Sequence, residues 1–294
     1  MLEDIKSNPL ISVIITVFIK DSAKFFRASL KSLIVQTYPF LQIVIVADGP
    51  LATEHEEVID ELLLYSAGLT LKRQILLIRR QRAEGPAKAR NEGIMQAKGE
   101  FIAIMDADDI SLPNRISSQF EFLSQNNLDV SSSNYIEIDA DDNVIGTKKM
   151  PLSHNEIKDI CPFLCPMNNP AIFARKEALL NGYQENLRFG EDYRLWISLL
   201  KKGYRFGNHP DNLIKYRENA EFHSRRRGWS RGWSDFYSKL LAMPLVRFHK
   251  RPLVLLVAIL TFLVRLLPTS LLAHAYKVRR LMSFRRSQDT PTIA

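Results

Sequence analysis

The first half of the chain alternates strand-like apolar runs with helix-like segments, and this alternation restricts the possible folds more than any other feature. Four apolar runs are predicted strands: Ile11–Ile19, Leu41–Ala47, Lys72–Arg80 and Phe101–Met105. Helical patterns separate them at about residues 22–37, 54–67 and 86–97. Such alternation is typical of a mostly parallel sheet with helices on both faces. The sequence therefore predicts an α/β fold.

The second half is less regular, and its predicted elements mix helices with short strands. Pro113–Gln125 predicts a helix that Asp109 or Ser111 would cap. The other predicted elements are a hairpin over about 130–150, a short strand at Ala171–Ala174, a helix at Tyr193–Lys202, and two short strands near Tyr204–Gly207 and Asn212–Tyr216.

Composition indicates a globular protein. A chain of 294 residues with 46% hydrophobic content can bury a full core, which excludes disordered and fibrous classes. We predict a catalytic domain over residues 1–217 and a basic, helical C-terminal segment over residues 218–294.

The tetrapeptide Asp-Ala-Asp-Asp occurs twice, and its surroundings differ. At 106–109 it follows the apolar run 101–105, so three carboxylates emerge at the carboxyl end of a predicted buried strand. Carboxylates placed there can hold Mg²⁺ or Mn²⁺. At 139–142 it follows an alternating segment, which predicts the polar tip of a half-exposed hairpin. A solvated turn is the simpler interpretation of that second copy.

Polar and aromatic residues follow two other predicted strands. Thr16 and Phe18 lie near the end of the first, and Asp48 follows the second at a turn made by Gly49-Pro50. Asp48 is either a turn former or a carboxylate that accepts a hydrogen bond from the imide N–H of a uracil. Because ligands of open α/β sheets sit beyond the carboxyl ends of strands, we expect these residues to share a cleft with the cluster at 106–109.

Two predicted helix starts carry charges that have a functional interpretation. Lys88 and Arg90 follow Gly85, where they form either a solvated basic surface or a site for a phosphate at the helix N-terminus. Glu191 and Asp192 follow Gly190, where they are either N-terminal capping residues or include a general base for a hydroxyl group.

Positive charge is concentrated near the C-terminus. Residues 215–294 contain 16 Lys and Arg but 4 Asp and Glu, a net charge of +12, whereas residues 1–214 carry −4. The basic residues flank the apolar run 252–264 and do not belong to a recognised nucleic-acid-binding module, so we expect anionic lipid and not nucleic acid as the partner. The expected headgroup contacts are Arg225, Arg226, Arg227, Lys250, Arg251, Arg279 and Arg280, with Trp229 and Trp233 at the interface.

The run 252–264 is short for a membrane span. As a helix it would extend about 20 Å, against a hydrocarbon core of about 30 Å. An interfacial or re-entrant helix is the favoured interpretation, and the alternatives are a true span or a soluble helix packed on the catalytic domain or on a second subunit. Because Met1–Asn8 is polar and no cleavage-site pattern follows, we expect the chain at the cytoplasmic face of the cell membrane, as a peripheral or monotopic protein.

Taken in order, these motifs resemble the family 2 glycosyltransferases of the bacterial cell-surface polysaccharide type, an inverting family with the Rossmann-like GT-A fold. The matching segments over about residues 10–217 are the Asp-Gly turn at 43–50, residues 88–94, Gly99–Ile102 leading to 106–109, Pro113–Ile116, Asn169-Pro170, Gly190–Trp196 and Tyr216-Arg217. Where the family commonly has Pro-Val-Tyr-Asn and Asp-Asp-Gly-Ser, this chain has Thr16–Ile19 and Ala47–Pro50, which removes one carboxylate from the nucleotide pocket.

The resemblance implies a nucleotide-sugar site over about residues 10–110 and an acceptor and catalytic half over about residues 111–217. It implies a DxD motif formed by Asp106 and Asp108, with Asp108 as the direct ligand of Mn²⁺ or Mg²⁺. It further implies that Asp192 is the catalytic base and Glu191 its neighbour. The implied donor-binding residues are Thr16, Phe18, Asp48, Lys88, Arg90 and Asp106, with Asp48 on the nucleobase.

The implied reaction is metal-assisted single displacement, in which a sugar passes from a nucleoside-diphosphate sugar to an acceptor hydroxyl with inversion. A UDP-sugar is favoured, thymidine and guanosine donors are alternatives, and the basic tail suggests a lipid-linked or cell-surface glycan as acceptor. Competing interpretations are a metal-dependent phosphohydrolase or nucleotidyltransferase, since Asp-x-Asp after a buried strand also serves phosphoryl transfer, and an inactive membrane-bound scaffold of the same fold. If the chain self-associates, we expect a homodimer.

Overall fold

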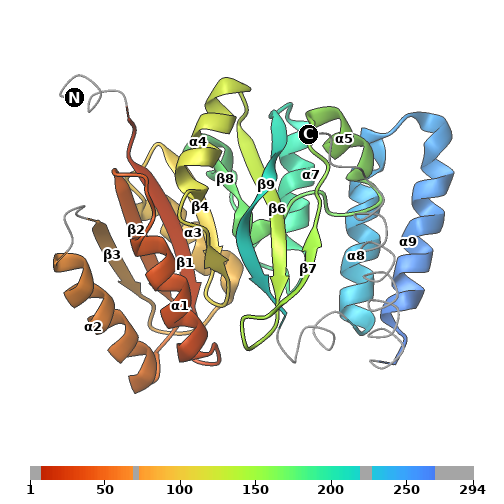
Figure 1. The fold of residues 1–294 in the computed structure, drawn as a ribbon. Helices are drawn as coiled ribbons and strands as arrows, with labels where there is room; N and C mark the ends of the chain where they lie inside the picture. The colour runs from red at the N-terminus through yellow and green to blue at the C-terminus, as the bar shows by residue number, and fades with distance from the viewer. Residues whose placement is uncertain (1–7, 69–72, 219–226, 269–294) are drawn as a thin grey trace.

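A computed structural model describes residues 8–68, 73–218 and 227–268, and in this part of the chain one mixed sheet is covered by helices (Figure 1). The strand order is β3-β2-β1-β4-β8-β6-β9-β5, with β7 pairing to β6 outside this path. Arg225, Arg226, Arg279 and Arg280, expected to contact lipid headgroups, lie outside the described residues.

The four strands on one side of the sheet are parallel, as the alternation predicts. They are β1 (Ile11–Val17), β2 (Leu41–Ala47), β3 (Gln74–Arg79) and β4 (Phe101–Asp106). The helices that connect them are α1 (Ala23–Ile34), α2 (Thr53–Ala67) and α3 (Pro86–Gln96). Because parallel strands end at the same edge, the residues that follow β1, β2 and β4 lie together at one end of the sheet.

The other side of the sheet is mixed. β8 (Phe173–Arg175) runs antiparallel to β4 and to β6 (Val130–Ile138). β9 (Phe206–Arg217) runs parallel to β6 and antiparallel to β5 (Ile110–Ser111). β7 (Val144–Lys148) pairs antiparallel with β6 and completes the predicted hairpin. The α/β prediction is therefore confirmed, with antiparallel strands extending the sheet beyond its parallel half.

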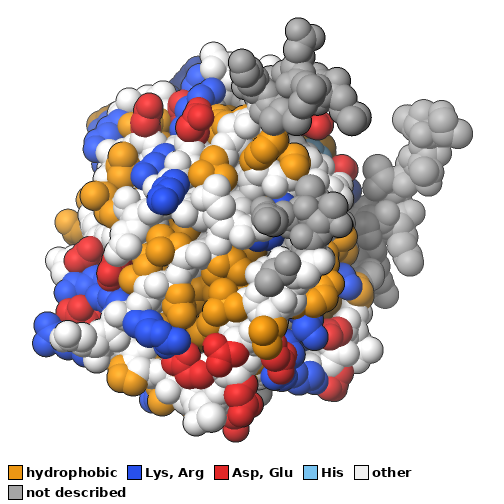
Figure 2. Space-filling view, turned by 90° about the vertical axis from the view of Figure 1, so that its left-hand side faces the viewer, with side chains coloured by type: hydrophobic (Ala, Val, Ile, Leu, Met, Phe, Trp, Pro, Cys, Tyr) orange, Lys and Arg blue, Asp and Glu red, His pale blue; other side chains and the backbone are white. Residues whose placement is uncertain are grey.

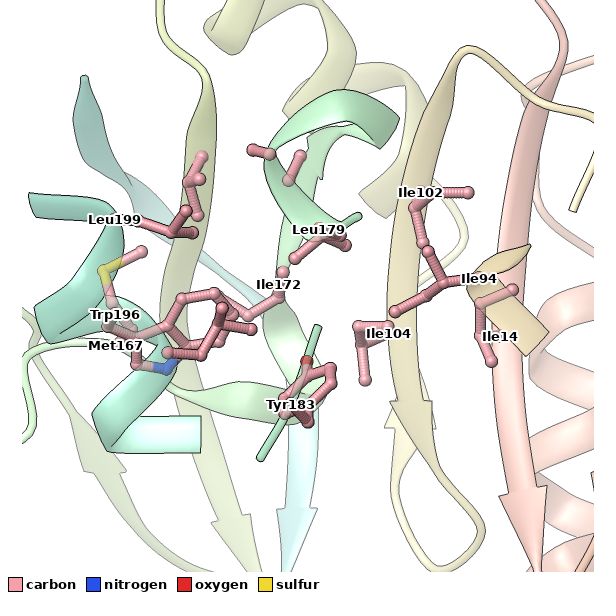
Figure 3. Packing of buried hydrophobic residues seen from close by; sticks show 14 of the residues in the cluster. Ile14, Ile94, Ile102, Ile104, Met167, Ile172, Leu179, Tyr183, Trp196 and Leu199 are labelled. Carbon is pink, nitrogen blue, oxygen red and sulfur yellow. The ribbon is translucent and has the colours of Figure 1, made fainter. Parts of the chain in front are cut away.

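Side-chain alternation along β1 divides the core into two layers. Val13 and Ile15 pack with Phe26 of α1 on one face. Ile14 packs with Ile94 of α3 on the other, where the two side chains face each other in Figure 3. Burying one such side chain contributes about 1.5–3 kcal/mol, so a strand covered on both faces is firmly held. This two-sided burial explains the near-continuous apolar sequence of the strands.

The predicted cap of α4 (Arg115–Gln125) is wrong. The helix begins after Asn114 and has no side-chain cap. Asp109 instead accepts a hydrogen bond from β9, and the Ser111 hydroxyl accepts one from Gln36. Asp109 precedes the short strand β5 and Ser111 is the last residue of that strand, so residues 112–114 still separate both from the start of the helix.

Two predicted strand boundaries are also wrong. The segments near 204–207 and 212–216 form one strand, β9, whose register against β6 shifts opposite Ser133 and Asn134. Pro210 lies at that irregularity, and a proline without an N–H suggests a break in a sequence pattern. The predicted strand Ala171–Ala174 is a 3₁₀ turn over Asn169–Ala171 followed by β8.

Most of the remaining helices lie at the end of the molecule away from β3 (Figure 1), but the short helix that follows β8 contacts β4 and β8 near the middle of the sheet. These helices are α5 (His154–Ile160), α6 (Lys176–Leu179), α7 (Glu191–Lys201), α8 (Trp229–Ala242) and α9 (Arg251–Arg265). α8 and α9 lie side by side, and α8 also contacts α7 (Figure 1). Within the described ranges, none of the helices combines the length and apolar character that crossing a bilayer requires.

The opposite end of the molecule carries α2 and the edge strand β3. Hydrophobic side chains gather in the middle of this face, with charged side chains around them (Figure 2). On α2 the exposed large apolar side chains are Leu63, Leu64 and Tyr65. The described surface therefore presents exposed apolar side chains at both ends of the sheet.

Candidate active site

The ends of β1, β2 and β4 bring predicted site residues together. Thr16 is paired with Asp106 in the β1–β4 register. Asp48 follows β2, and its N–H donates to the carbonyl oxygen of the last residue of β1 at 2.8 Å. The N–H of Phe18 donates to Asp21 Oδ2 at 2.8 Å, which closes the turn after β1. The strand ends converge as the sequence predicts.

Arg90 joins Asp106, at the end of β4, to Glu191, at the start of α7. Its Nη2 lies 2.9 Å from Asp106 Oδ1, and its Nη1 lies 3.1 Å from Glu191 Oε1. The guanidinium also lies over the Tyr183 ring, 5.5 Å from the centroid. Burial would lower the pKa of Arg90, but the charges of Asp106 and Glu191 outweigh it and raise that pKa. Arg90 is thus a permanent cation between the strand-end carboxylates and the start of α7.

Asp192 is a partly buried carboxylate at the start of α7. The Tyr193 N–H donates to its Oδ1 at 2.7 Å. Burial, followed by the charge of Glu191, raises the pKa of Asp192 to about 6, while Arg231 opposes the shift. A carboxylate with a pKa near the working pH is suited to general-base catalysis.

The turn before Asp192 is held by α8, in the segment predicted to lie outside the catalytic domain. The Ser234 hydroxyl donates to the Phe189 carbonyl oxygen at 2.7 Å. Gly190 has φ +74°, a left-handed conformation that glycine adopts without strain, and a Cβ there would lie 3.1 Å from Ser234 Oγ. The residues that present Asp192 are therefore packed against the C-terminal helices.

Asp48 and Lys88 belong to a separate charged cluster. The Asp48 carboxylate accepts the N–H groups of Glu84 at 3.0 Å and of Gly85 at 2.9 Å, and it forms an ion pair with Arg80. Lys88 Nζ lies 2.8 Å from Glu84 Oε1. The anion that the N-terminus of α3 favours is thus a carboxylate of the protein itself. Sequence reasoning offered a turn, a nucleobase or a phosphate here, and missed this pairing.

Asp108 and Asp109 follow β4 in different environments. Asp108 is partly exposed, whereas Asp109 is fully buried. Asp109 Oδ1 accepts the Arg217 N–H at 2.8 Å, and its Oδ2 is buried without a hydrogen-bond partner. Burial, with the charges of Asp108 and Asp106, raises the pKa of Asp109 well above its usual value.

The carboxylates of Asp106 and Asp108 fit a hard divalent cation, because both supply oxygen at a partly exposed strand end. Among the described residues no group of three or more His, Cys, Asp or Glu side chains could hold a metal ion. A cation bound here therefore needs oxygens from water or from a phosphorylated ligand, as is usual for Mg²⁺.

Arg115 holds the end of β4, the strand that leads into the acidic loop at 106–109. Sequence reasoning missed this contribution. Its guanidinium is fully buried and donates to the carbonyl oxygens of Ile104 at 2.9 Å and Ile172 at 3.2 Å. Burial lowers the pKa of Arg115 to about 9. The sequence did offer a signal, because Arg115 lies in Pro113–Ile116, one of the segments that resemble the family. That resemblance did not predict a role for it.

Two solved structures share the fold. TarS from S. aureus in complex with UDP-GlcNAc superposes with a TM-score of 0.62 at 17% identity, covering 84% of this chain and 70% of that one. Mannosyltransferase PcManGT from Pyrobaculum calidifontis, in complex with GDP-Man and Mn²⁺, superposes with a TM-score of 0.61 at 17% identity, covering 96% and 83%. The architecture is the GT-A fold.

Three relatives align over nearly their whole lengths. An uncharacterized glycosyltransferase of Haemophilus influenzae is 32% identical over 273 residues, 90% of this chain and 97% of the relative. The amylovoran biosynthesis glycosyltransferase AmsE of Erwinia amylovora is 29% identical, covering 92% and 99%. The UDP-Gal:alpha-D-GlcNAc-diphosphoundecaprenol beta-1,3-galactosyltransferase of Escherichia coli is 28% identical, covering 94% and 98%.

The family match spans more than half of the chain. Residues 12–182 match the family described as glycosyl transferase family 2. This range contains β1 to β8 and the strand-end carboxylates, and the full-length relatives extend the similarity through α7 to α9. The chain is therefore a glycosyltransferase and belongs to glycosyl transferase family 2.

Proposed function

We propose that this enzyme transfers a sugar from a nucleoside-diphosphate sugar, with a UDP-sugar as the favoured donor, to a hydroxyl of a lipid-linked glycan, with inversion. The observation that carries the proposal is the chain of contacts from Asp106 through Arg90 to Glu191, beside Asp192. It connects the strand ends suited to a donor diphosphate with a carboxylate suited to remove a proton.

In the proposed reaction Asp192 accepts the proton of the acceptor hydroxyl as that oxygen attacks the anomeric carbon. The nucleoside diphosphate leaves from the opposite face, so the configuration inverts. Arg90 offsets the negative charge of Asp106 and Glu191 and keeps both carboxylates in place. Asp108 and Asp106 would hold Mn²⁺ or Mg²⁺, which neutralises charge on the departing diphosphate.

The relatives support the choice of donor and acceptor. The name of the Escherichia coli relative specifies a UDP-sugar donor and a diphosphoundecaprenol-linked acceptor. The named Erwinia relative acts in amylovoran biosynthesis. By this proposal Thr16, Phe18 and Asp48 lie on the nucleoside side of the site and Lys88 near its phosphates. A guanosine donor, as in the PcManGT complex, is the alternative.

We also propose that the enzyme works at the cytoplasmic face of the cell membrane, held there by α8 and α9. Exposed apolar side chains cover both helices: Trp229, Trp233, Tyr237, Leu253, Leu255, Leu256, Ile259, Leu260, Leu263 and Val264. Lys250 and Arg251 lie at the start of α9, where they suit anionic headgroups. An apolar helix face flanked by basic residues is typical of interfacial binding. Homodimer formation stays a prediction, and analytical sedimentation, which measures the oligomeric state, would test it.

A transfer assay tests the central proposal. Purified enzyme is incubated with Mn²⁺, a panel of nucleotide sugars and a polyprenyl-diphosphate sugar, and both the nucleotide product and the new linkage are identified by mass spectrometry and NMR. The proposal expects a nucleoside diphosphate and an inverted anomeric configuration. Release of free phosphate or pyrophosphate would favour a phosphohydrolase or nucleotidyltransferase, and failure to bind any donor would favour the inactive scaffold.

A further inference from the structure

Arg217, at the end of β9, contacts both copies of the Asp-Ala-Asp-Asp tetrapeptide. Its backbone N–H donates to Asp109 Oδ1 and its Nε donates to the Asp108 carbonyl oxygen, each at 2.8 Å. Its Nη1 donates to the Asp139 carbonyl oxygen at 2.8 Å, and its Nη2 lies 2.6 Å from Asp142 Oδ1. One guanidinium therefore joins the loop at 106–109 to the hairpin tip at 139–142.

We propose that Arg217 is a positioning residue that uses the hairpin tip as an anchor to fix the 106–109 loop, and so orients Asp108 for the metal-bound donor. The metal part of this inference rests on the proposed function. The second tetrapeptide then has a role in the enzyme without binding any ligand itself.

The contacts require the shape of a guanidinium. The Arg217 side chain is 1% exposed, and its planar fork donates in three directions at once. Its flat face lies over the Phe25 ring, with the guanidinium carbon 4.2 Å from the centroid. A lysine keeps the charge but presents a single flexible ammonium, so it cannot hold the Asp108 and Asp139 carbonyls and the Asp142 carboxylate together.

The hairpin tip is held in shape by hydrogen bonds of its own. Asp139 Oδ1 accepts the N–H groups of Asp141 at 2.9 Å and Asn143 at 3.0 Å, which closes the turn. Asp142 has φ +66°, a conformation that few residues other than glycine adopt. In this conformation its carboxylate forms the ion pair with Arg217. Holding the Asp108 carbonyl against such an anchor restricts the peptide that carries the Asp108 side chain.

A conservative pair of variants at the tip separates positioning from general stability. Asp142→Asn removes the charge that faces Arg217. Asp141→Asn is the control: it removes the charge of the neighbouring residue, which takes part in the turn through its backbone N–H and not through its carboxylate. Arg217→Lys is the stronger change at the other end of the same ion pair. All three are compared with the wild-type enzyme by thermal unfolding in EDTA, so that a folding defect is visible separately.

Two measurements follow for each variant. The first is the Mn²⁺ concentration that half-saturates UDP binding in titration calorimetry. Loss of an outer-shell partner costs about 10–100-fold in metal affinity, so we expect an increase of about tenfold for Asp142→Asn, a larger one for Arg217→Lys, and less than about twofold for Asp141→Asn. The second is amide hydrogen exchange of residues 106–112 without ligand, which should become faster in the first two variants only.

The outcomes are distinguishable. Unchanged exchange of the 106–112 segment in Arg217→Lys and Asp142→Asn would overturn the positioning role, whatever the ligand. If wild-type enzyme shows no Mn²⁺-dependent UDP binding while exchange responds as expected, the proposed metal and donor are wrong and the anchoring of the loop stands. Equal responses of Asp141→Asn and Asp142→Asn would show a general charge effect, and would also overturn the proposal.

Discussion

At the scale of single residues, the site depends on pairings across long sequence separations. Ligands of open α/β sheets bind beyond the carboxyl ends of the strands, and this rule together with the family resemblance was enough to group Asp106, Arg90 and Glu191. Their contacts were not predictable, because Arg90 and Glu191 are 101 residues apart and a helix-start cation has many potential partners. Asp48 was placed correctly at the end of a buried strand, but its hydrogen bonds to the Glu84 and Gly85 N–H groups depend on loop geometry that no short sequence pattern records.

Asp192→Asn tests the general base. The amide keeps the shape of the side chain but cannot accept a proton, so kcat should fall by about 10²–10⁴. Donor binding, measured by titration calorimetry with the nucleoside diphosphate, should change little. Turnover close to wild type in this variant would remove Asp192 from the role.

The pH dependence of the reaction tests the same residue independently. A base works only when ionised, and the pKa of Asp192 is raised to about 6. Activity should therefore be constant above this value and fall about tenfold per pH unit below it. Arg231→Gln should move the acid limb of the kcat profile to higher pH, because the Arg231 charge lowers the pKa of Asp192. An acid limb near pH 4 in wild-type enzyme would contradict the assignment.

Asp108→Ala and Asp141→Ala compare the two tetrapeptides. Removing a direct metal ligand should weaken Mn²⁺-dependent binding of UDP by more than the roughly 10–100-fold expected for an outer-shell group. Asp141→Ala should be nearly silent, because the hairpin tip holds Arg217 through the Asp139 carbonyl oxygen and the Asp142 carboxylate, and not through the Asp141 carboxylate. Similar losses in both variants would mean that the first copy has no special role.

At the scale of elements, the start of α7 and the buried face of α8 form one unit. Hydrophobic periodicity predicted α7 within two residues of its observed bounds, and the apolar run 252–264 predicted α9. The contact between α7 and α8 was not predictable, because α8 buries polar residues such as Ser234 and Ser238, which give no apolar periodic signal. The predicted boundary near residue 217 rests on the charge pattern and on the extent of the family resemblance, whereas the Ser234–Phe189 hydrogen bond crosses it.

Gly190→Ala and Gly203→Ala make a matched test of this unit. Both glycines flank α7 with positive φ, +74° and +87°, so both substitutions should cost about 1–2 kcal/mol of folding stability. Only at residue 190 does the new Cβ meet α8, 3.1 Å from Ser234 Oγ, while nothing lies within 4 Å at residue 203. Activity corrected for the folded fraction should therefore fall in Gly190→Ala alone. Equal activities of the two variants would exclude the contact as a determinant.

At the scale of the whole molecule, the parallel half of the sheet was predictable, whereas in the mixed half only the β6–β7 hairpin was predicted as a pairing. Strands buried on both faces leave continuous apolar runs, and β2 was predicted at its observed bounds. β8 has three residues and β5 has two, so neither is long enough to show a period. Their places are set by tertiary contacts such as the register between β4 and β8.

Vesicle binding tests the proposed orientation of the molecule at a membrane. The enzyme should co-sediment with vesicles that contain anionic lipid, and less so at high salt. Leu256→Gln with Leu260→Gln on α9 should weaken partitioning at least about tenfold, since each exposed leucine contributes on the order of 1.5–3 kcal/mol when buried in lipid. Leu63→Gln with Leu64→Gln on α2 removes the same side chains from the opposite end and should have little effect. The reverse pattern would place the membrane at the other end.

The ion pairs of Arg90 also limit how such enzymes can be recombined. Arg90 belongs to the segment expected to recognise the donor, and Glu191 to the segment expected to recognise the acceptor. A chimaera that joins residues 1–110 of this chain to the later part of a relative keeps the Arg90–Asp106 pair, but it keeps the second ion pair only if the relative also has a carboxylate at position 191. Because losing one of two ion pairs of a buried cation is destabilising, acceptor specificity should be easiest to exchange between parents that match at positions 90 and 191. The two halves of the enzyme are consequently expected to evolve as one unit.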